Sequence, residues 1–280
     1  MTHRRWRLRG IAGWMGLWLA GAFVFAVAGA GAAELPVLDW TPGSDWINVK
    51  DHGAVGDGQA DDTAAIQRAL DAMRDGSTVY FPAGVYRLGG EIRILKPKVE
   101  HTDGRYLGNN IYGHGRDTTL VWDGPDDGTM MRDMGMVHCR VIGLSFDGRG
   151  RAAYGINHDN DQKFETHLFY QFLAFRDFRE CAFWLVPNDI DGQATAETMI
   201  RHSLFERCGV GLSLNSWNDY NFTVDGCHFA DNRRGIHCNN GNFYVRNTRF
   251  ERNELDIWAK PEHGISARRC VSIGSGGFLE

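Results

Sequence analysis

The stretch FERCGVGL (residues 205–212) recurs without a gap as FADNRRGI (229–236) and FERNELDI (250–257), and before them as FRECAFWL (178–185). Each copy begins with phenylalanine, has cysteine or asparagine in fourth place and ends with leucine or isoleucine. Successive copies are 27, 24 and 21 residues apart. A further apolar column lies twelve positions before the last residue of each copy, at Leu173, Ile200, Val224 and Val245. Repeats of this length are typical of solenoids, in which each copy packs on the next.

Each copy is expected to form two or three short strands, because the residues between the columns are β-favouring or polar and no segment after Val137 has helical apolar spacing. Parallel pairing of successive coils would stack equivalent side chains about 4.8 Å apart. Asn232 and Asn253 then form a buried amide ladder. Cys181 is expected above Cys208 as a pair of stacked thiols, since parallel Cβ atoms suit a disulfide badly.

Three stretches upstream of the repeats have a different pattern: NVKDHGAVGDGQADDTAAIQRAL (residues 48–70), GSTVYFPAGVYRL (76–88) and IYGHGRDTTLVWDG (111–124). The first predicts a turn followed by an amphipathic helix, and the second predicts two strands joined by a turn. Together they resemble the N-terminal cap and an early coil of the pectate-lyase-like superfamily, which includes polygalacturonase-type hydrolases, exo-β-glucanase-like enzymes and phage tailspikes. The resemblance implies an all-β fold, a right-handed parallel β-helix (solenoid) with an N-terminal capping α-helix.

The catalytic motifs of well-known members are missing from this sequence. Polygalacturonase-type members carry Asn-Thr-Asp and Arg-Ile-Lys motifs and alginate epimerases carry Asp-Pro-His, and none of these occurs here. Asp61-Asp62 lies at the start of the predicted helix and is expected to be structural. Gly113-His114-Gly115 falls before the main coils and is expected to form a turn. The resemblance therefore predicts the fold but leaves the reaction open.

Residues 1–33 have the layout of a secretory signal peptide, with four arginines before an apolar run that ends in small residues. An uncleaved N-terminal anchor is the alternative, so membrane contact is expected only if this segment is kept. Residues 34–280 are predicted to form a single β-helix domain, with a cap region (34–95), first coils (96–136) and regular coils (137–280). Whether residues 1–33 are cleaved or kept as an anchor, residues 34–280 are expected to be exported to the periplasm or outside the cell.

The net charge of −5 becomes −9 once the four arginines of the leader are removed, which makes nucleic acids poor partners. The C-terminal residues GGFLE (276–280) contain no amphipathic cap, so an open β edge is expected there. The chain could therefore be truncated, or its open end could pair with another subunit of a homo-oligomer. The six cysteines have no zinc-site spacing and are interpreted as small buried residues.

Extra residues gather at one turn of the stack, because the linkers after the last apolar column measure 17, 15, 12 and 9 positions in successive coils. Loops that project from one face of a solenoid commonly form its binding wall. Aromatic rings stack on sugars, while amides and carboxylates bind hydroxyl groups. The candidate catalytic residues are Asp159, Asp161, Asp189 and Asp191. The candidate substrate-binding residues are His158, Lys163, Asn188, Trp217, Asp219, Tyr220 and His237.

The leading hypothesis is an exported polysaccharide-active enzyme, a glycoside hydrolase in which one carboxylic acid protonates the leaving oxygen and a second carboxylate activates water or attacks the anomeric carbon. Asp159 or Asp161 facing Asp189 or Asp191 would supply the pair, with no cofactor or metal. One alternative is a non-catalytic carbohydrate-binding or tailspike-like structural β-helix. The other is a polysaccharide lyase or epimerase, with Lys163 or a nearby arginine as base and calcium held by several aspartate oxygens.

Overall fold

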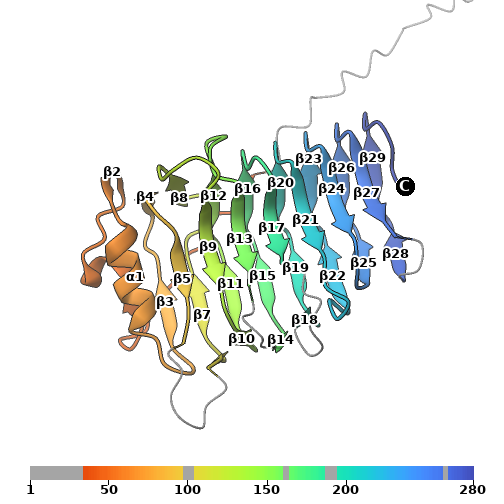
Figure 1. The fold of residues 1–280 in the computed structure, drawn as a ribbon. Helices are drawn as coiled ribbons and strands as arrows, with labels where there is room; N and C mark the ends of the chain where they lie inside the picture. The colour runs from red at the N-terminus through yellow and green to blue at the C-terminus, as the bar shows by residue number, and fades with distance from the viewer. Residues whose placement is uncertain (1–33, 97–103, 160–163, 187–193, 261–263) are drawn as a thin grey trace, which may run out of the picture. The chain divides into compact units, whose positions relative to one another are not determined.

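The computed structural model describes residues 34–96, 104–159, 164–186, 194–260 and 264–280. Residues 33–280 form one compact unit, in which short strands stack coil upon coil with α1 (Thr63–Asp71) at one end (Figure 1). The predicted parallel β-helix with a capping helix is confirmed. Among the described residues, no helix is long and apolar enough to cross a membrane. The predicted signal peptide, residues 1–33, lies outside the described residues.

Four sheets run along the stack, and the chain visits them in the order IV, I, II, III in each four-sided coil. Sheet I contains β1 (Ile47–Asn48), β3 (Thr78–Tyr80), β7 (Asn110–Tyr112), β11 (Arg140–Ile142), β15 (Phe169–Gln171), β19 (Met199–Arg201), β22 (Phe222–Asp225), β25 (Phe243–Arg246) and β28 (Ile265–Arg268). Sheet II contains β2 (Asp57–Asp61), β4 (Gly84–Leu88), β8 (Thr118–Trp122), β12 (Ser145–Asp147), β16 (Ala174–Arg176), β20 (Leu204–Glu206), β23 (His228–Ala230), β26 (Arg249–Glu251) and β29 (Val271–Ile273).

Sheets III and IV are shorter. Sheet III contains β5 (Ile92–Ile94), β9 (Thr129–Asp133), β13 (Tyr154–His158), β17 (Cys181–Leu185), β21 (Val210–Leu214), β24 (Arg234–Cys238) and β27 (Leu255–Ala259). Sheet IV contains β6 (Tyr106–Leu107), β10 (Met136–Val137), β14 (Phe164–Thr166) and β18 (Ala194–Ala196). Sheet IV gives a fourth side to the coils that it crosses.

The cap consists of α1 and the short 3-10 helix η1 (Val49–His52), which lies beside it. The apolar face of α1, including Ile66 and Leu70, is buried against the core. Asp62 is 1% exposed, and its carboxylate accepts hydrogen bonds from the backbone N–H groups of Val55 and Gly56 at 2.6 and 3.1 Å. Asp62 therefore fixes the turn that precedes the helix, which is the structural role predicted for it.

A ladder of stacked phenylalanine rings fills the core below sheet II. Phe146, Phe175, Phe205, Phe229 and Phe250 lie on successive coils, with neighbouring ring centroids 4.6–5.2 Å apart and interplanar angles of 14° or less. The predicted phenylalanine column is thus confirmed for the last three coils. Stacking of like rings follows from the in-register parallel pairing.

The predicted register of the coil around residues 170–185 is wrong by two or three residues. Phe175, not Phe178, pairs with Phe205, so this coil is 30 residues long and not 27. In the same way Tyr170 replaces Leu173 in the sheet I column, and Phe183 replaces Leu185 in the sheet III column. The sequence FRDFRECAFWL offers two phenylalanines three residues apart. Both phenylalanines are buried, so the sequence pattern alone allows either one to be aligned with Phe205.

The asparagine ladder is confirmed. Asn232 Oδ1 accepts a hydrogen bond from Cys208 N at 2.9 Å, and Asn253 Oδ1 accepts one from Asn232 N at 2.9 Å. The amide nitrogens donate to the carbonyls of Phe205 and Phe229, each at 3.0 Å. The ladder thus satisfies buried backbone groups at the turn between sheets II and III.

The predicted stack of two thiols is not formed. Cys181 pairs with Val210 and not with Cys208, because of the shifted register. All six cysteines are free thiols, five of them buried and Cys270 half-buried. Burial raises the pKa of the Cys208 thiol to about 12, which makes it unreactive.

The coils change from four sides to three after β18. Sheet IV strands contain β-favouring residues, whereas the corresponding later linkers, residues 215–221 and 239–242, are rich in Asn, Ser and Gly and form turns. The length of a linker alone does not decide whether it forms a strand or a turn. Ten positions separate Met131 of β9 from Val141 of β11 and include a strand, whereas twelve separate Leu212 from Val224 and include none. The composition of the linker therefore selects strand or turn.

The predicted steady shortening of the linkers is wrong in its first step. With the observed registers, 14 positions separate Ile156 from Tyr170, and 17 separate Phe183 from Ile200. Shortening begins only after that coil.

Residues 34–46, here called the strap, lie along the outside of the coils. Leu35 is 5% exposed and packs with Ala174 and Leu204 on the outer side of sheet II. Trp40 Nε1 donates to Gly113 O at 2.7 Å. His114 Nδ1 lies 2.7 Å from Leu38 O, so the Gly-His-Gly motif holds the strap and is structural, as predicted.

Candidate functional site

Five of the eleven predicted site residues lie outside the described residues. This holds for Asp161, Lys163, Asn188, Asp189 and Asp191. The predicted pair of catalytic carboxylates therefore remains a prediction.

Asp159 is half-buried, and its carboxylate is held in an ion pair. Asp159 Oδ2 lies 2.8 Å from Arg132 Nη1, and Arg132 Nη2 lies 3.0 Å from Glu91 Oε2. A carboxylate that accepts from a guanidinium in this way is positioned by it. A hydrolase role would require this ion pair to open.

Three further predicted residues lie on the outer side of the coils. Trp217 is 63% exposed and Tyr220 is 36% exposed, in the turn-rich linker after β21. His237 stacks on Trp258 on the outside of sheet III, with centroids 4.4 Å apart. Burial and the neighbouring cations Arg234, Arg233 and Lys260 lower the pKa of His237 to about 4. His237 is therefore neutral at pH 7.

The remaining two predicted residues point into the solenoid. His158 and Asp219 are each 1% exposed, so the expected position on an outer loop wall is wrong for both. Asp219 accepts hydrogen bonds from the backbone N–H groups of Thr195, Asn215 and Ser216 at 3.2, 3.0 and 2.8 Å. Burial raises the pKa of Asp219 to about 7 despite these donors.

His158 belongs to an interior triad with Asp133 and Glu165. His158 Nδ1 lies 3.0 Å from Glu165 Oε2 and 3.3 Å from Asp133 Oδ2, and its Nε2 lies 3.1 Å from the Tyr170 hydroxyl. Burial raises the pKa of Asp133 well above its usual range and that of Glu165 to about 7, and it lowers the pKa of His158. A polymer outside the coils has no direct access to this triad, because all three side chains are buried.

The outer face of sheet I carries a hollow of about 400 Å³, here called the histidine hollow. Its lining consists of His138, Cys139, Arg140, His167 and Phe169. Arg140 and Phe169 are register partners on adjacent strands, so cation and ring lie side by side. Burial raises the pKa of the Cys139 thiol to about 12, which makes this thiol unreactive.

The two histidines occupy equivalent turns of successive coils, between sheets IV and I. Their ring centroids are 4.7 Å apart. His167 Nε2 lies 3.0 Å from Glu197 Oε2 on the next coil, and His167 Nδ1 lies 2.9 Å from Thr166 Oγ1. A carboxylate bonded to a ring nitrogen orients the imidazole and stabilises its protonated form.

These turn residues adopt left-handed backbone conformations, with φ of 55° at His138, 55° at His167 and 50° at Glu197. The preceding coil has Gly108 at the equivalent place, with φ 71° and open space around an added Cβ. Glycine adopts this conformation without strain. The backbone conformation of this turn is therefore one that glycine also adopts in an adjacent coil.

A second hollow of about 440 Å³ lies further along the same face, over β22, β25 and β28. Tyr244, Arg246 and Arg268 line it. Asp225 lies 3.4 Å from both Arg201 and Arg246. The outer face of sheet I thus presents a row of guanidinium groups with aromatic rings among them, on a chain whose net charge is −5.

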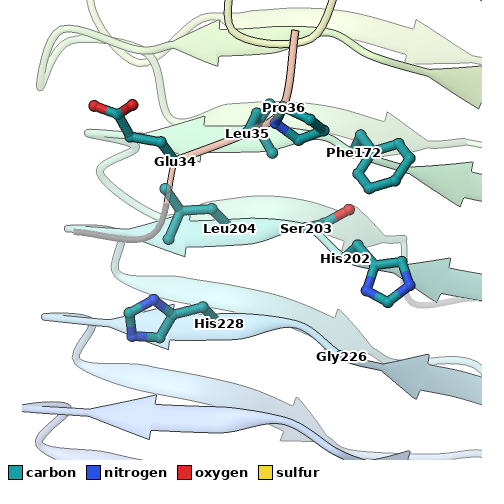
Figure 2. Close-up of a pocket in the computed structure, with 9 residues that line it drawn as sticks. All are labelled: Glu34, Leu35, Pro36, Phe172, His202, Ser203, Leu204, Gly226 and His228. Atoms are coloured by element: carbon teal, nitrogen blue, oxygen red, sulfur yellow. The ribbon is translucent and has the colours of Figure 1, made fainter. Parts of the chain in front are cut away.

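A third hollow, of about 250 Å³, lies between the strap and the outer side of sheet II. Figure 2 shows Glu34, Leu35 and Pro36 lying across the strands, with His202, Ser203 and His228 below them. The Ser203 hydroxyl donates to Arg201 O at 2.8 Å and accepts from Leu173 N at 3.1 Å. A hydroxyl used in this way within a turn is a poor nucleophile, so this hollow is the weaker candidate.

Comparison with known proteins completes this description. The family model described as rhamnogalacturonase A/epimerase, pectate lyase-like, matches residues 46–131, which contain the cap and the first coils. The remaining coils continue the same parallel sheets. Over these residues the chain is similar to the pectate-lyase-like family.

Two curated proteins to which this chain is similar come from Azotobacter vinelandii. Mannuronan C5-epimerase AlgE3 is 49% identical over 81 residues, which are 27% of this chain and 4% of the relative. Alginate lyase 7 is 60% identical over 45 residues, which are 15% of this chain and 5% of the relative. The match therefore spans only a small part of each relative.

One solved structure shows how far the fold likeness extends. Pantoea stewartii WceF, described as a glycan biofilm modifying enzyme with a bacteriophage tailspike-like parallel β-helix fold, has a TM-score of 0.60 at 15% identity. The likeness covers 86% of this chain and 40% of WceF. At this identity the likeness shows the shared fold alone.

Sequence reasoning did not find the histidine hollow, although a signal was present. The segments VHCRVIGLSF (137–146), THLFYQFLAF (166–175) and AETMIRHSLF (196–205) align without a gap. His138, His167 and Glu197 each stand eight residues before a phenylalanine of the core ladder. The shifted register around Phe175 concealed this column.

Proposed function

We propose that this protein binds an acidic polysaccharide along the outer face of sheet I and acts on its uronate residues by proton abstraction, as a lyase or an epimerase. The observation that carries the proposal is the histidine hollow, where His138, His167 and Arg140 lie together beside Phe169. Sequence relatives named as mannuronan epimerases and an alginate lyase support this substrate class.

The chemistry begins at the carbon next to the uronate carboxylate. Arg140 is suited to pair with that carboxylate, because a guanidinium binds carboxylates through two parallel hydrogen bonds. Pairing withdraws charge and makes the C5 proton more acidic. Phe169 offers a ring on which the sugar can stack.

His167 is the base in this proposal. Its Nδ1 takes the C5 proton in place of its contact with the Thr166 hydroxyl, 2.9 Å away, while the Nε2–H donates to Glu197 at 3.0 Å, and this carboxylate stabilises the imidazolium that forms. For a lyase, the electron pair left on C5 forms the C4–C5 double bond, the bond from C4 to the glycosidic oxygen breaks, and the departing oxygen takes a proton from solvent water. For an epimerase, the carbanion takes a proton from solvent water on the opposite face of C5, and in both cases the imidazolium returns its proton to solvent.

The same hollow explains why proton abstraction is preferred to hydrolysis. Hydrolysis requires two carboxyl groups at the scissile bond, whereas Asp159 is bound to Arg132, Asp219 is buried and the exposed Glu197 is paired with His167. The arginines of sheet I also favour an acidic polymer over a neutral one. We place the enzyme in the periplasm or outside the cell, on the signal-like layout of residues 1–33.

The test is an activity screen with purified protein on polymannuronate, polyguluronate, polygalacturonate and a neutral glucan, with and without added calcium. Ultraviolet absorbance of unsaturated ends reports elimination, proton NMR of the polymer reports epimerisation, and reducing ends without absorbance report hydrolysis. We expect elimination or epimerisation on at least one uronate polymer and none on the glucan.

Two variants locate the activity. His167→Gln is expected to lower kcat by about 100-fold or more, and Arg140→Gln is expected to raise KM for the same polymer. His52→Gln in the cap and Arg93→Gln on sheet III are the matched controls, and both should retain full activity. Hydrolysis as the only reaction, or full activity of His167→Gln, would reject the proposal.

A further inference from the structure

The interior triad of Asp133, His158 and Glu165 interrupts an otherwise apolar column. On sheet III the inward residues at this position of successive strands are Ile94, Asp133, His158 and Leu185. Glu165 reaches the same place from β14 of sheet IV and is 0% exposed. Two carboxylates and an imidazole therefore meet inside the core.

One ligand atom of the triad has no hydrogen-bond partner among the described residues. Asp133 is 0% exposed, and its Oδ2 accepts no hydrogen bond although it points at His158 Nδ1. The other oxygens are satisfied: Asp133 Oδ1 accepts from Gly135 N at 3.2 Å and Glu165 Oε1 from Met136 N at 3.3 Å. A buried carboxylate oxygen left without a donor costs free energy unless a cation or a proton occupies the space beside it.

The three facing atoms have the spacing of a metal site. His158 Nδ1, Asp133 Oδ2 and Glu165 Oε2 all lie within 4.8 Å of one another, and the nitrogen is 3.3 and 3.0 Å from the two oxygens. Ligands about 2.1 Å from a tetrahedral zinc ion are about 3.4 Å apart. Small movements of these three side chains would therefore allow an ion to bind between the three atoms.

The surroundings orient the imidazole correctly for this role. The Tyr170 hydroxyl lies 3.1 Å from His158 Nε2, so it can accept a hydrogen bond from a protonated Nε2. The Nδ1 lone pair then faces the carboxylates, as in metal sites where an outer partner fixes the histidine tautomer. Thr195 Oγ1 donates to Glu165 Oε2 at 3.0 Å and positions that carboxylate in turn.

We propose that the interior triad binds one divalent transition-metal ion through Asp133 Oδ2, His158 Nδ1 and Glu165 Oε2. One nitrogen and two carboxylate oxygens suit zinc or manganese, whereas calcium takes six to eight oxygen ligands. The ion would join β9, β13 and β14, and so tie sheet III to sheet IV. Because the site is enclosed, the ion enters as the chain folds, and its binding energy adds to the stability of the four-sided coils.

The test is refolding of the full chain after unfolding in denaturant with a chelator, with zinc, manganese, calcium or no metal added back. After desalting, elemental analysis should find one zinc or manganese ion per chain, and the Tm of that sample should exceed the Tm of the metal-free sample. Cobalt bound to the wild-type protein is the spectroscopic probe, because a cobalt ion with few ligands gives visible absorption bands. No retained metal and no cobalt bands would overturn the proposal.

Variants assign the ion to the triad. Glu165→Gln keeps the shape of the side chain and should weaken zinc binding by at least tenfold, and Asp133→Asn should do the same. Asp219→Asn, at a buried carboxylate outside the triad, should retain the ion. His167→Gln should also retain it. Loss of the ion in His167→Gln, with retention in Glu165→Gln, would place the metal on the outer face and reject the interior site.

Discussion

The coils up to β18 and the coils after it share three sheets but differ in what they enclose. The earlier coils have a fourth side, sheet IV, and enclose the interior triad with Tyr170. The later coils have three sides and enclose apolar residues, with the Asn232–Asn253 ladder at one corner. Sheet IV, as a fourth side, widens the interior of the coil. In a three-sided coil the side chains fill the interior without this extra space. A solenoid can thus change its interior chemistry through the linker at a single corner.

Asp219 marks the boundary between the two kinds of coil. It lies in the linker after β21, where sheet IV stops, and its Oδ1 accepts a hydrogen bond from Thr195 N of β18. Its Oδ2 accepts from Asn215 N and Ser216 N in its own turn. The Asp219 carboxylate therefore binds both β18, the last strand of sheet IV, and the turn of the next coil. In that next coil this turn replaces a further strand of sheet IV.

The largest expected effect is common to both regions. Phe229→Ala in a three-sided coil and Phe146→Ala in a four-sided coil each remove a fully buried ring of the ladder. Each should lower the free energy of unfolding by about 3–5 kcal/mol. Denaturant unfolding followed by circular dichroism measures both. A cost below about 1 kcal/mol for either ring would show that the ladder does not form the common core of the two regions.

A smaller effect should be confined to the three-sided region. Asn232→Ala leaves the N–H of Cys208 and the carbonyl of Phe205 without their buried partner. Each unsatisfied group costs about 1–3 kcal/mol, so we expect a loss of at least about 2 kcal/mol. The half-buried Asn218 provides the control, since Asn218→Ala should cost under about 1 kcal/mol. Equal losses in the two variants would contradict a structural amide ladder.

The boundary residue should make stability depend on pH. Because the side chain is buried, the pKa of Asp219 is raised to about 7 from its usual value of 3.8. The folded state therefore holds a proton that the unfolded state releases, so this contribution is full below about pH 4 and is lost as pH rises through 7. The slope is at most about 1.4 kcal/mol per pH unit.

Asp219→Asn removes this titration. Thermal unfolding between pH 4 and 7 should show a shallower decline in Tm for the variant than for the wild type, whatever its absolute stability. An identical slope in both proteins would mean that Asp219 is ionised in the folded state across this range.

The smallest effect concerns the charges outside the turns between sheets II and III. Arg252 Nε and Nη2 lie 2.7 and 2.6 Å from the two oxygens of Asp231, and hydrogen bonding to Arg252 lowers the pKa of Asp231. Exposed pairs of this kind contribute about 0–1 kcal/mol and are screened by salt. Arg252→Ala should therefore reduce stability by less than about 1 kcal/mol in low salt and by less still in 1 M salt. A loss above about 2 kcal/mol would indicate a buried role.

Columns of like residues made the fold predictable, because parallel in-register pairing repeats the same environment in each coil. That argument placed Phe205, Phe229 and Phe250 correctly. It failed at Phe178 because two buried phenylalanines stand three residues apart in that coil. Whether a linker becomes a strand of sheet IV depends on its composition, which the alignment of lengths ignored.

The candidate site was less predictable than the fold. Polarity suggested that His158 belonged to a loop, but its register with Asp133 turns the side chain inward. A polar residue at the end of a strand has two possible sides, and one position of register decides between them. His138 and His167 became recognisable only when the register of the Phe175 coil was known.

The central claim is that an acidic polysaccharide binds on the outer face of sheet I. Hydrogen exchange of the purified protein, with and without an excess of mannuronate oligosaccharides, tests this most directly. The account predicts slower exchange in residues 138–142, 167–171 and 197–201, and no change in residues 154–159 or 210–221. Protection confined to residues 154–159 and 210–221 would place the polymer on the sheet III side and contradict the account.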